Sequence, residues 1–205
     1  MEVLRTSLFL LIVLTFQFSF GQDNKAIQSA FENSFLSESK EEYKEGISFI
    51  KSVYSDNSYP SNLRLGWLYY LEGNYNSSLI YYKRAIKLMP AATEPFWGII
   101  NSQIALDKWV DVEKSYLSIL RLDPKNKIAN YKLGLIYYYR KNYTASKHYF
   151  DIALNLFPFD YDALLMSAWN NYFLGKSSEA KVLFNRVLLL YKNDSSALEG
   201  LSLIK

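Results

Sequence analysis

The 205-residue chain contains no cysteine and a single histidine, His148. Without cysteine there can be no disulfide scaffold, thiolate zinc site, cysteine nucleophile or lipid anchor on cysteine. One histidine leaves no room for a multi-histidine metal site. Five prolines and eight glycines are too few for a collagen-like or low-complexity chain. These absences exclude several classes of enzyme and of small secreted domain.

An excess of charge of one sign is also missing, because 23 basic residues face 20 acidic ones and the net charge is +3. A charge this small, spread over the whole length, gives weak support for nucleic-acid binding. What the chain has in quantity is apolar side chains, since half of its residues are hydrophobic and 17% are aromatic. This composition excludes a disordered chain and supports a packed core.

The longest apolar run covers residues 7–20 and is shorter than the roughly 20 residues that a helix needs to cross a bilayer. Arg5 precedes it, and small Ser19 and Gly21 stand before a cut at Gln22. We therefore interpret residues 1–21 as a Sec-type secretory signal peptide, with an uncleaved N-terminal anchor as the alternative. We expect the mature chain, 22–205, to be periplasmic or secreted. This ending, with glutamine after the cut, resembles exported proteins of the Bacteroidetes.

The remainder of the chain repeats with a period of 34 residues. Pro90, Pro124 and Pro158 follow one another at this step, and Leu65-Gly66 returns as Leu133-Gly134 after two periods. Further columns keep the same step and the same kind of side chain. They are Tyr82, Tyr116, Phe150 and Phe184; Ala85, Ile119, Ala153 and Val187; and Leu88, Leu122, Leu156 and Leu190. Chance does not align this many columns, so the chain is built from repeated units.

The order of these residues, with Leu-Gly-x-x-Tyr first and a proline last, resembles the tetratricopeptide repeat. The resemblance covers four repeats, at 59–92, 93–126, 127–160 and 161–194, with a degenerate repeat at 24–58 and a capping helix at 195–205. Ile99-Ile100 replaces Leu-Gly in the second of the four, and Ser167-Ala168 replaces it in the last. The resemblance implies an all-α, right-handed solenoid of about five helix-turn-helix pairs over residues 22–205.

Residue spacing supports the same unit. Leu65, Gly66 and Tyr69 lie on one face of a first helix, and Gly73 is placed to adopt the left-handed conformation that ends it. Proline cannot donate to the helical ladder, so each closing proline ends a second helix. Thr93 is predicted to cap the following helix, with Pro95 in its first turn. No helix pair can bury its apolar face alone, so the pairs must stack.

In this family the first helices line a concave surface that usually holds extended peptides, and the resemblance implies a partner-binding site there. The candidate residues share the face of the first helix that is turned away from its partner helix. They are Leu63, Arg64, Trp67, Tyr70, Trp97, Asn101, Tyr131, Lys132, Leu135, Tyr138, Leu165, Trp169 and Tyr172. Aromatic side chains anchor interfaces at low entropic cost. A second interpretation stays open, in which these rings only pack between neighbouring first helices.

Polar candidates are few. Arg64, Asn101 and Lys132 stand where some members of the family hold a terminal carboxylate, but the full clamp is absent. His148 lies beside Lys147 and is interpreted as a solvated surface residue, with Asp151 as its nearest acidic neighbour along the chain. The acidic and basic residues from 38 to 45 are interpreted as one solvated helix face.

The sequence contains no P-loop, dinucleotide glycine fingerprint, paired-carboxylate motif or EF-hand loop. We therefore expect a protein that is not an enzyme and that has no catalytic residue, metal or cofactor. The leading hypothesis is a protein–protein interaction scaffold of the cell envelope, which binds a partner segment in its aromatic groove. Glycan or peptidoglycan binding through the same groove is the alternative. Self-association through incompletely capped ends also stays open, whereas nucleic acid and a membrane span after signal cleavage are not expected.

Overall fold

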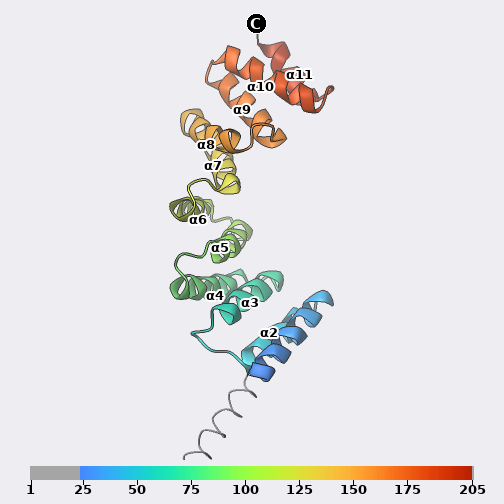
Figure 1. Cartoon of the computed structure of the whole chain (residues 1–205), viewed down its shortest axis with the longest axis vertical. Helices are drawn as coiled ribbons and strands as arrows, with labels where there is room; N and C mark the ends of the chain where they lie inside the picture. Colours follow the sequence, from blue (N-terminus) through green and yellow to red (C-terminus); the bar gives the residue numbers. More distant parts are fainter. Residues whose placement is uncertain (1–23, 205) are drawn as a thin grey trace, which may run out of the picture. The chain divides into compact units, whose positions relative to one another are not determined.

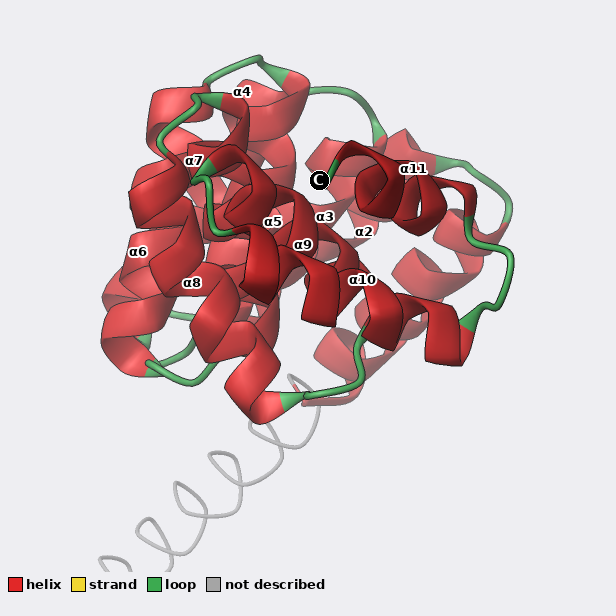
Figure 2. Ribbon diagram, turned by 90° about the horizontal axis from the view of Figure 1, so that it is seen from above, coloured by secondary structure: helices red, strands yellow, loops and turns green. Residues whose placement is uncertain are grey.

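A computed structural model of the chain describes residues 24–204. All regular secondary structure in this range is helical, and the range contains no strand (Figure 2). None of the helices between residues 24 and 204 is both long enough and apolar enough to cross a bilayer. The signal peptide expected at residues 1–21 lies outside the described residues.

The chain divides into two compact units between Leu106 and Asp107. Unit 1 contains a helix over residues 24–39, then α2 (Tyr43–Ser52), α3 (Tyr59–Leu71), α4 (Tyr75–Leu88) and α5 (Glu94–Ala105). Unit 2 contains α6 (Trp109–Leu122), α7 (Lys127–Tyr139), α8 (Tyr143–Leu156), α9 (Tyr161–Phe173), α10 (Ser177–Leu190) and α11 (Ser195–Leu203), and Figure 1 follows both units by colour. The division falls between α5 and α6, inside the predicted repeat 93–126.

Within each unit, helices that are adjacent in sequence pack together. In unit 1, α3 packs on α4 and α4 on α5, and α3 also contacts α5. In unit 2, α7 packs on α8, α8 on α9 and α9 on α10, and α7 also contacts α9. A first helix therefore touches both its partner helix and the first helix of the next pair. This is the stacked helix-turn-helix arrangement of an α-solenoid, and it confirms the predicted fold class.

Side-chain caps begin most of the first helices, because the orphan amides there need acceptors. Asn126, Asp160 and Asp194 accept from the amides of Ala129, Ala163 and Ala197 at 3.0, 3.0 and 2.8 Å. Thr93 precedes α5 and a proline stands in the first turn, as predicted, but the Thr93 side chain makes no capping hydrogen bond. The second helices α4, α6 and α8 end at Leu88, Leu122 and Leu156, each two residues before its proline.

The turn inside each pair places one residue in the left-handed region. Gly73 has φ +83°, as predicted, and Gly175 has φ +72°. Asp107 and Lys141 hold the same position of their repeats with φ +56° and +59°. A side chain at positive φ is disfavoured, because Cβ crowds the backbone. The turn geometry is therefore retained even where the sequence does not supply glycine.

An aromatic ring of the second helix packs on glycines of the first helices. The Tyr82 ring lies between Gly66 of α3 and Gly98 of α5, where an added Cβ would come within 2.9 Å and 2.0 Å of it. Phe150 covers Gly134 of α7 in the same way. The Leu-Gly position of α5 holds Ile99-Ile100, as the sequence interpretation noted. Gly98 stands two residues before Ile100 and meets the ring of the preceding pair, as Gly200 of α11 meets Phe184 of α10.

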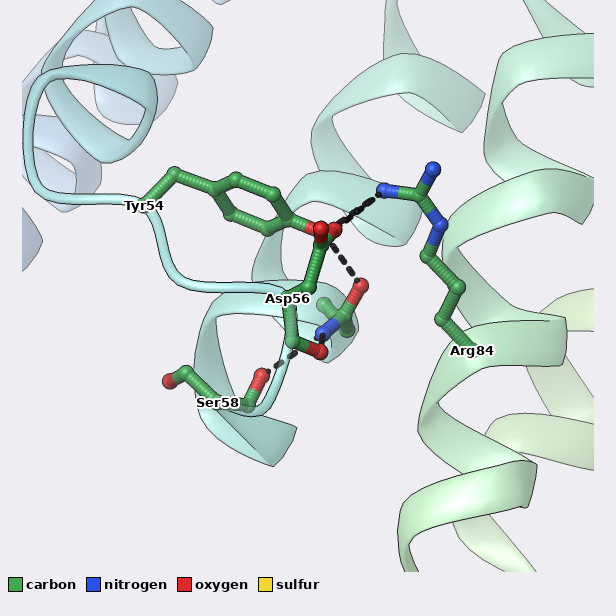
Figure 3. Close-up of polar contacts among 5 residues, drawn as sticks. Tyr54, Asp56, Ser58 and Arg84 are labelled. Carbon is green, nitrogen blue, oxygen red and sulfur yellow. Dashed lines mark hydrogen bonds and ion pairs between the residues drawn. The ribbon is translucent and has the colours of Figure 1, made fainter.

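A polar latch links the connector that follows α2 to the second helix of the next pair. The Nη1 of Arg84 on α4 donates to the Tyr54 hydroxyl at 2.8 Å and pairs with Asp56 Oδ1 at 2.9 Å, as Figure 3 shows. The Tyr54 hydroxyl lies 2.9 Å from both Asp56 Oδ1 and Asn62 Oδ1, and it donates to one of them at a time. The latch fixes the connector against α4 without burying an unpaired charge.

Candidate functional site

Unit 1 contains a cleft of about 730 Å³ between the helix 24–39, α3 and α5, with α4 beneath. Its walls combine apolar and aromatic side chains with a small number of polar groups. They are Phe31, Phe35, Glu38 and Ser39 of the first helix, Pro60, Leu63, Arg64 and Trp67 of α3, Tyr82 of α4, and Glu94, Trp97, Gly98 and Asn101 of α5. A concave, mainly apolar surface with a few convergent polar groups is typical of a binding site.

The sequence candidates of unit 1 converge on this cleft, with one exception. Leu63, Arg64, Trp67, Trp97 and Asn101 all line it. Tyr70 does not line the cleft and instead stacks beside the Trp67 ring, with centroids 5.6 Å apart and an interplanar angle of 27°. It therefore supports the wall from behind.

Arg64 is the candidate whose role differs most from the expectation, because its side chain is only 6% exposed. Its Nε donates to Ser34 Oγ at 2.6 Å, one Nη donates to the Ser34 carbonyl at 2.8 Å, and the other pairs with Glu38. The guanidinium also stacks over the Phe35 ring, 3.9 Å from its centroid. These contacts neutralise the charge of Arg64 and use its hydrogen-bond donors. Arg64 therefore holds the helix 24–39 against α3 and is not available to clamp a carboxylate.

Glu38 takes part in the same contact between the helix 24–39 and α3. Its second oxygen accepts from Trp67 Nε1 at 2.8 Å, which fixes the indole in the cleft wall. The interpretation of residues 38 to 45 as one solvated helix face is wrong for two reasons. The helix ends at residue 39, and Glu41 in the following turn has φ +62°, so the charges lie on two helices. Glu38 itself is partly buried against Arg64.

Tyr82 forms the floor of the cleft, and only 4% of the residue is exposed. Its hydroxyl makes no hydrogen bond with the described residues. Burial raises the pKa of Tyr82 well above its usual range, and the negative charge of Glu94 adds to the effect. The phenol therefore stays neutral at any physiological pH.

The α5 wall carries the polar groups that remain. Glu94 is exposed at the start of α5 and accepts a long hydrogen bond of 3.3 Å from the Tyr59 hydroxyl. Asn101 is also exposed, and Trp97 and Gly98 lie between the two. Opposite them, Phe31 and Phe35 come from the segment that the sequence interpretation described only as a degenerate repeat. The lining residues that were missed are thus Phe31, Phe35, Glu38, Ser39, Pro60, Tyr82, Glu94 and Gly98.

The ring candidates of unit 2 form a second assembly at the ends of α7 and α9. Tyr138 contacts Tyr143 and Phe173 edge-on, with centroids 5.7 and 5.9 Å apart, and Tyr143 stacks on Phe173 at 5.0 Å. Burial raises the pKa of Tyr138 to about 12. Trp169 continues the assembly toward Tyr172 at 5.7 Å. We call these five residues the ring cluster.

The other unit 2 candidates serve packing or face solvent. Trp169 Nε1 donates to Ser196 Oγ at 2.9 Å, which ties α9 to the capping helix α11. Leu165 packs on the core of α9 and α10, and Leu135 is half-buried on α7. The Tyr131 ring lies 5.8 Å from Phe150, and Lys132 is exposed beside Tyr131. Trp169 and Leu165 therefore pack within unit 2.

No arrangement of catalytic groups emerges in residues 24–204. That part of the chain contains no group of histidine, aspartate and glutamate side chains able to hold a metal ion. His148 is exposed, as expected, and it meets the Tyr149 ring edge-on at 5.1 Å. Asp151 does not orient it, because its carboxylate pairs with Lys147 at 2.8 Å.

Two tetratricopeptide-repeat family models match the chain, one at residues 61–92 in unit 1 and one at residues 162–194 in unit 2. The chain is a tetratricopeptide-repeat protein. Both matches fall on helix pairs that the structure resolves, α3 with α4 and α9 with α10. No curated protein sequence matches this tetratricopeptide-repeat protein.

Solved structures of other proteins share the fold. A tetratricopeptide-repeat protein from Parabacteroides merdae is 20% identical with a TM-score of 0.72, covering 86% of this chain and 71% of that one. MamA is 17% identical with a TM-score of 0.69, covering 84% and 95%. YrrB, described as a TPR protein with an unusual peptide-binding site, is 13% identical with a TM-score of 0.67, covering 88% and 98%. At these identities the likeness of this tetratricopeptide-repeat protein to them concerns the fold alone.

Proposed function

We propose that the protein is a non-enzymatic scaffold that binds a segment of another protein in the cleft of unit 1. The observation that carries this proposal is the cleft itself. Its walls come from three first helices or their equivalents, and it presents Phe35, Trp67 and Trp97 around a volume of about 730 Å³. This volume lies within the range of about 300–1,000 Å³ that is usual for ligand sites and accommodates a few side chains of a partner.

The construction of the walls supports a preformed site. Trp67 is held by its hydrogen bond to Glu38, and Arg64 locks the helix 24–39 to α3. A wall that is ordered before binding saves the partner much of the entropic cost of association. The description of YrrB as a peptide-binding protein agrees with this use of the fold but concerns that protein only.

The test places a photo-reactive p-benzoylphenylalanine at Asn101, which is exposed in the cleft. The matched control places the same residue at Asn76, which is exposed on α4 outside the cleft. The full chain is irradiated in an envelope extract, and covalent adducts are mapped by mass spectrometry. We expect a protein segment cross-linked to position 101 and absent at position 76. Equal adducts at both positions, or none at position 101, would contradict the proposal.

Asn101→Arg is a better blocking variant than alanine at Trp67 or Trp169. Both tryptophans hold structural hydrogen bonds, to Glu38 and to Ser196, so removing them alters the fold as well as the surface. An arginine at exposed position 101 fills the cleft from its rim and leaves these bonds in place. Asn76→Arg is its control, and only the cleft variant should lose the cross-linked partner.

We also propose that the protein acts in the cell envelope, as a periplasmic or secreted chain. The support is the sequence of residues 1–21, which has the charge, apolar run and small residues of a secretory signal. The intact mass of the protein from the periplasmic fraction checks this. A mature N-terminus at Gln22 is expected, and a full-length chain in the membrane fraction would indicate an anchor instead.

Glycan binding is the second candidate, and the exposed end of the ring cluster favours it. Phe173 is 47% exposed, and Tyr139, which meets Tyr138 of the cluster edge-on at 5.6 Å, is 74% exposed. Aromatic rings at a surface can stack on sugar rings. Titration with an oligosaccharide panel, followed by tryptophan fluorescence, tests this candidate. A shift in the wild type that a Tyr139→Ala, Phe173→Ala variant loses would support it, and a flat titration would not.

A further inference from the structure

We infer that the cleft of unit 1 selects a partner segment through one lysine or arginine side chain, seated between the aromatic walls and directed at Glu94. This inference rests on the proposed function and names the chemistry that the partner must present.

The charges that line the cleft do not cancel. Arg64 and Glu38 neutralise each other in their buried ion pair, and Glu38 also accepts from Trp67. Glu94 has no cationic partner among the described residues and receives only the long hydrogen bond from Tyr59. The cleft therefore carries one uncompensated negative charge although the whole chain has a net charge of +3. Charge complementarity points to a cation.

Two further polar groups of the cleft lining have unused hydrogen-bonding capacity. The Tyr82 residue is 96% buried, and its hydroxyl has no partner in the described chain, although it lines the cleft floor. The hydroxyl oxygen is not one of the sealed, unpaired polar atoms of the described chain, so it is open to the cleft and a bound side chain can reach it. Its oxygen can accept from an ammonium or guanidinium. The exposed Asn101 carbonyl oxygen offers a further acceptor at the rim.

The aromatic walls suit the same occupant. Trp67 and Trp97 line the cleft around the floor formed by Tyr82, together with Phe35, whose ring already carries the Arg64 guanidinium. Cations are attracted to the faces of aromatic rings by about 0.5–1 kcal/mol at exposed sites, and tryptophan is the strongest of these rings. The apolar stem of a lysine or arginine also packs well on such walls while its charged end reaches a carboxylate. A neutral apolar side chain would satisfy the rings but leave the negative charge of Glu94 uncompensated.

The opposite chemistry, an anionic terminus, does not fit. The sequence offers Arg64 and Lys132 as candidate cations for such a terminus, but Arg64 is already paired with Ser34 and Glu38. Lys132 belongs to unit 2 and does not line this cleft. A carboxylate placed here would meet Glu94 without a compensating positive charge.

The experiment uses the full chain and a set of blocked heptapeptides. Each peptide has a central test position flanked by two leucine or phenylalanine residues at varied spacing. Every sequence is made in three forms, with lysine, norleucine or glutamate at the test position. Affinities are measured by calorimetry at low salt, and the bound site is checked by protection of the cross-link at position 101. We expect lysine peptides to bind about fivefold more tightly than their norleucine forms, and glutamate forms to bind most weakly.

Two variants locate the effect. Glu94→Gln keeps the shape of the side chain and removes its charge, so the lysine preference should fall below twofold. Tyr82→Phe keeps the ring between Gly66 and Gly98 and removes only the hydroxyl, and it should reduce the preference partly. Glu45→Gln, at an exposed position of α2 outside the cleft, is the charge-matched control and should preserve the preference. Helicity is measured for each variant.

The outcomes separate the two claims. Norleucine peptides that bind in the cleft as tightly as lysine peptides would overturn this inference and leave the binding scaffold standing. A lysine preference that survives in Glu94→Gln would overturn it as well. Failure of every peptide to protect position 101 would count against both the inference and the proposed function.

Discussion

Tyr82 has two roles, since its ring fills unit 1 and its hydroxyl faces the cleft. The ring is sandwiched between Gly66 and Gly98, so the separation of α3 and α5 depends on the absence of side chains at these two positions. Close-packed interiors do not absorb an extra methyl group without cost. Tyr82 therefore contributes both to the stability of unit 1 and to the shape of the candidate site.

Gly98→Ala should lower the free energy of unfolding by about 1–3 kcal/mol. The added Cβ would lie 2.0 Å from Cζ of Tyr82, and Gly66 lies against the same ring, so the ring or α5 must shift. Urea denaturation measures the loss. In a Tyr82→Leu background the same glycine substitution should cost much less, because the clashing ring atom is gone. An equal cost in both backgrounds would show that the clash is not the cause.

Glu113 provides a pH-dependent contact between α6 and α7. Burial acts to raise the pKa of Glu113, but the hydrogen bond of 2.6 Å from the Tyr137 hydroxyl and the ion pair with Arg140 outweigh it, and the pKa falls below 4.5. A carboxyl whose pKa is lowered on folding stabilises the protein above its unfolded pKa, and the contribution disappears as the pH falls through the folded value. The same bond raises the pKa of Tyr137 to about 12.

Compared with wild type, Glu113→Gln should therefore be less stable at pH 7 by up to about 1 kcal/mol, since solvent still reaches the pair. The gap should narrow as the pH is lowered through the folded pKa of Glu113, because the wild-type carboxyl then becomes protonated. Urea denaturation of both proteins over a series of pH values below 7 gives the comparison. A gap that stays constant over the whole series would mean that ionisation of Glu113 does not stabilise the fold.

For single residues, the sequence predicted which repeat positions hold small or aromatic side chains, but not which side chains touch between repeats. Ala85, Ala153 and Val187 are fully buried, as their column required. Gly98 and Glu38 were missed because their partners, Tyr82 and Arg64, belong to neighbouring helix pairs. A period of 34 residues shows which positions are equivalent. It does not show how one pair is rotated onto the next, and that rotation decides which side chains meet.

At the level of the element, the turn within each pair carries a conformational cost that differs between repeats. Gly73 and Gly175 adopt positive φ freely, whereas Lys141 adopts φ +59° with a side chain. A left-handed residue other than glycine costs about 1–2 kcal/mol, and glycine also gains freedom in the unfolded chain. The turn between α7 and α8 is thus held by the helices on either side of it.

Lys141→Gly should stabilise the protein by roughly 0.5–1 kcal/mol, because the relief of strain exceeds the extra entropy of the unfolded chain. Thermal and urea denaturation measure this gain. Lys132→Gly, at an exposed position inside α7, is the control and should destabilise by about 1 kcal/mol. Destabilisation by both substitutions would argue against the left-handed turn.

The latch on α4 tests how a connector is held. Arg84→Gln removes the hydrogen bond to Tyr54 and the ion pair with Asp56, but both charged side chains are substantially exposed, at 43% and 76%. The expected loss of global stability is therefore only about 0.5–1 kcal/mol. The local effect should be larger, with faster amide exchange in residues 53–58. Lys83→Gln on the same helix is the control and should leave that exchange unchanged.

Element boundaries were largely predictable, because proline, glycine and capping residues mark them. The closing prolines follow α4, α6 and α8, and Gly73 ends the turn after α3 as expected. The break between the helix 24–39 and α2 was not predicted. It is made by Glu41 at φ +62°, a residue with no turn preference that the charge pattern placed within a helix. Packing of Gly46 against Leu68 and the Ser34 carbonyl holds α2 in place there.

For the molecule as a whole, every helix packs on helices close to it in sequence. The contacts within unit 2 join α7 to α8 and α9, and those within unit 1 join α3 to α4 and α5. In such proteins the stability is approximately a sum of repeat terms and nearest-neighbour interface terms. A substitution that destabilises one repeat should therefore destabilise the adjacent repeats more than distant ones. The sequence predicted this locality through its period, but it gave no sign that the helices group into two units divided after Leu106.

Ala153→Arg tests both the repeat alignment and this locality. Ala153 is fully buried on α8, so an arginine there would overpack the interface and bury a charge without a partner. The expected loss is several kcal/mol, roughly 3–5, in urea denaturation. Hydrogen exchange should show lost protection in α7, α8 and α9 and retained protection in α3 and α4. Asn155→Arg, at an exposed position of α8, is the control and should change neither measurement. Unchanged stability of Ala153→Arg would contradict the alignment that places this residue in the buried column.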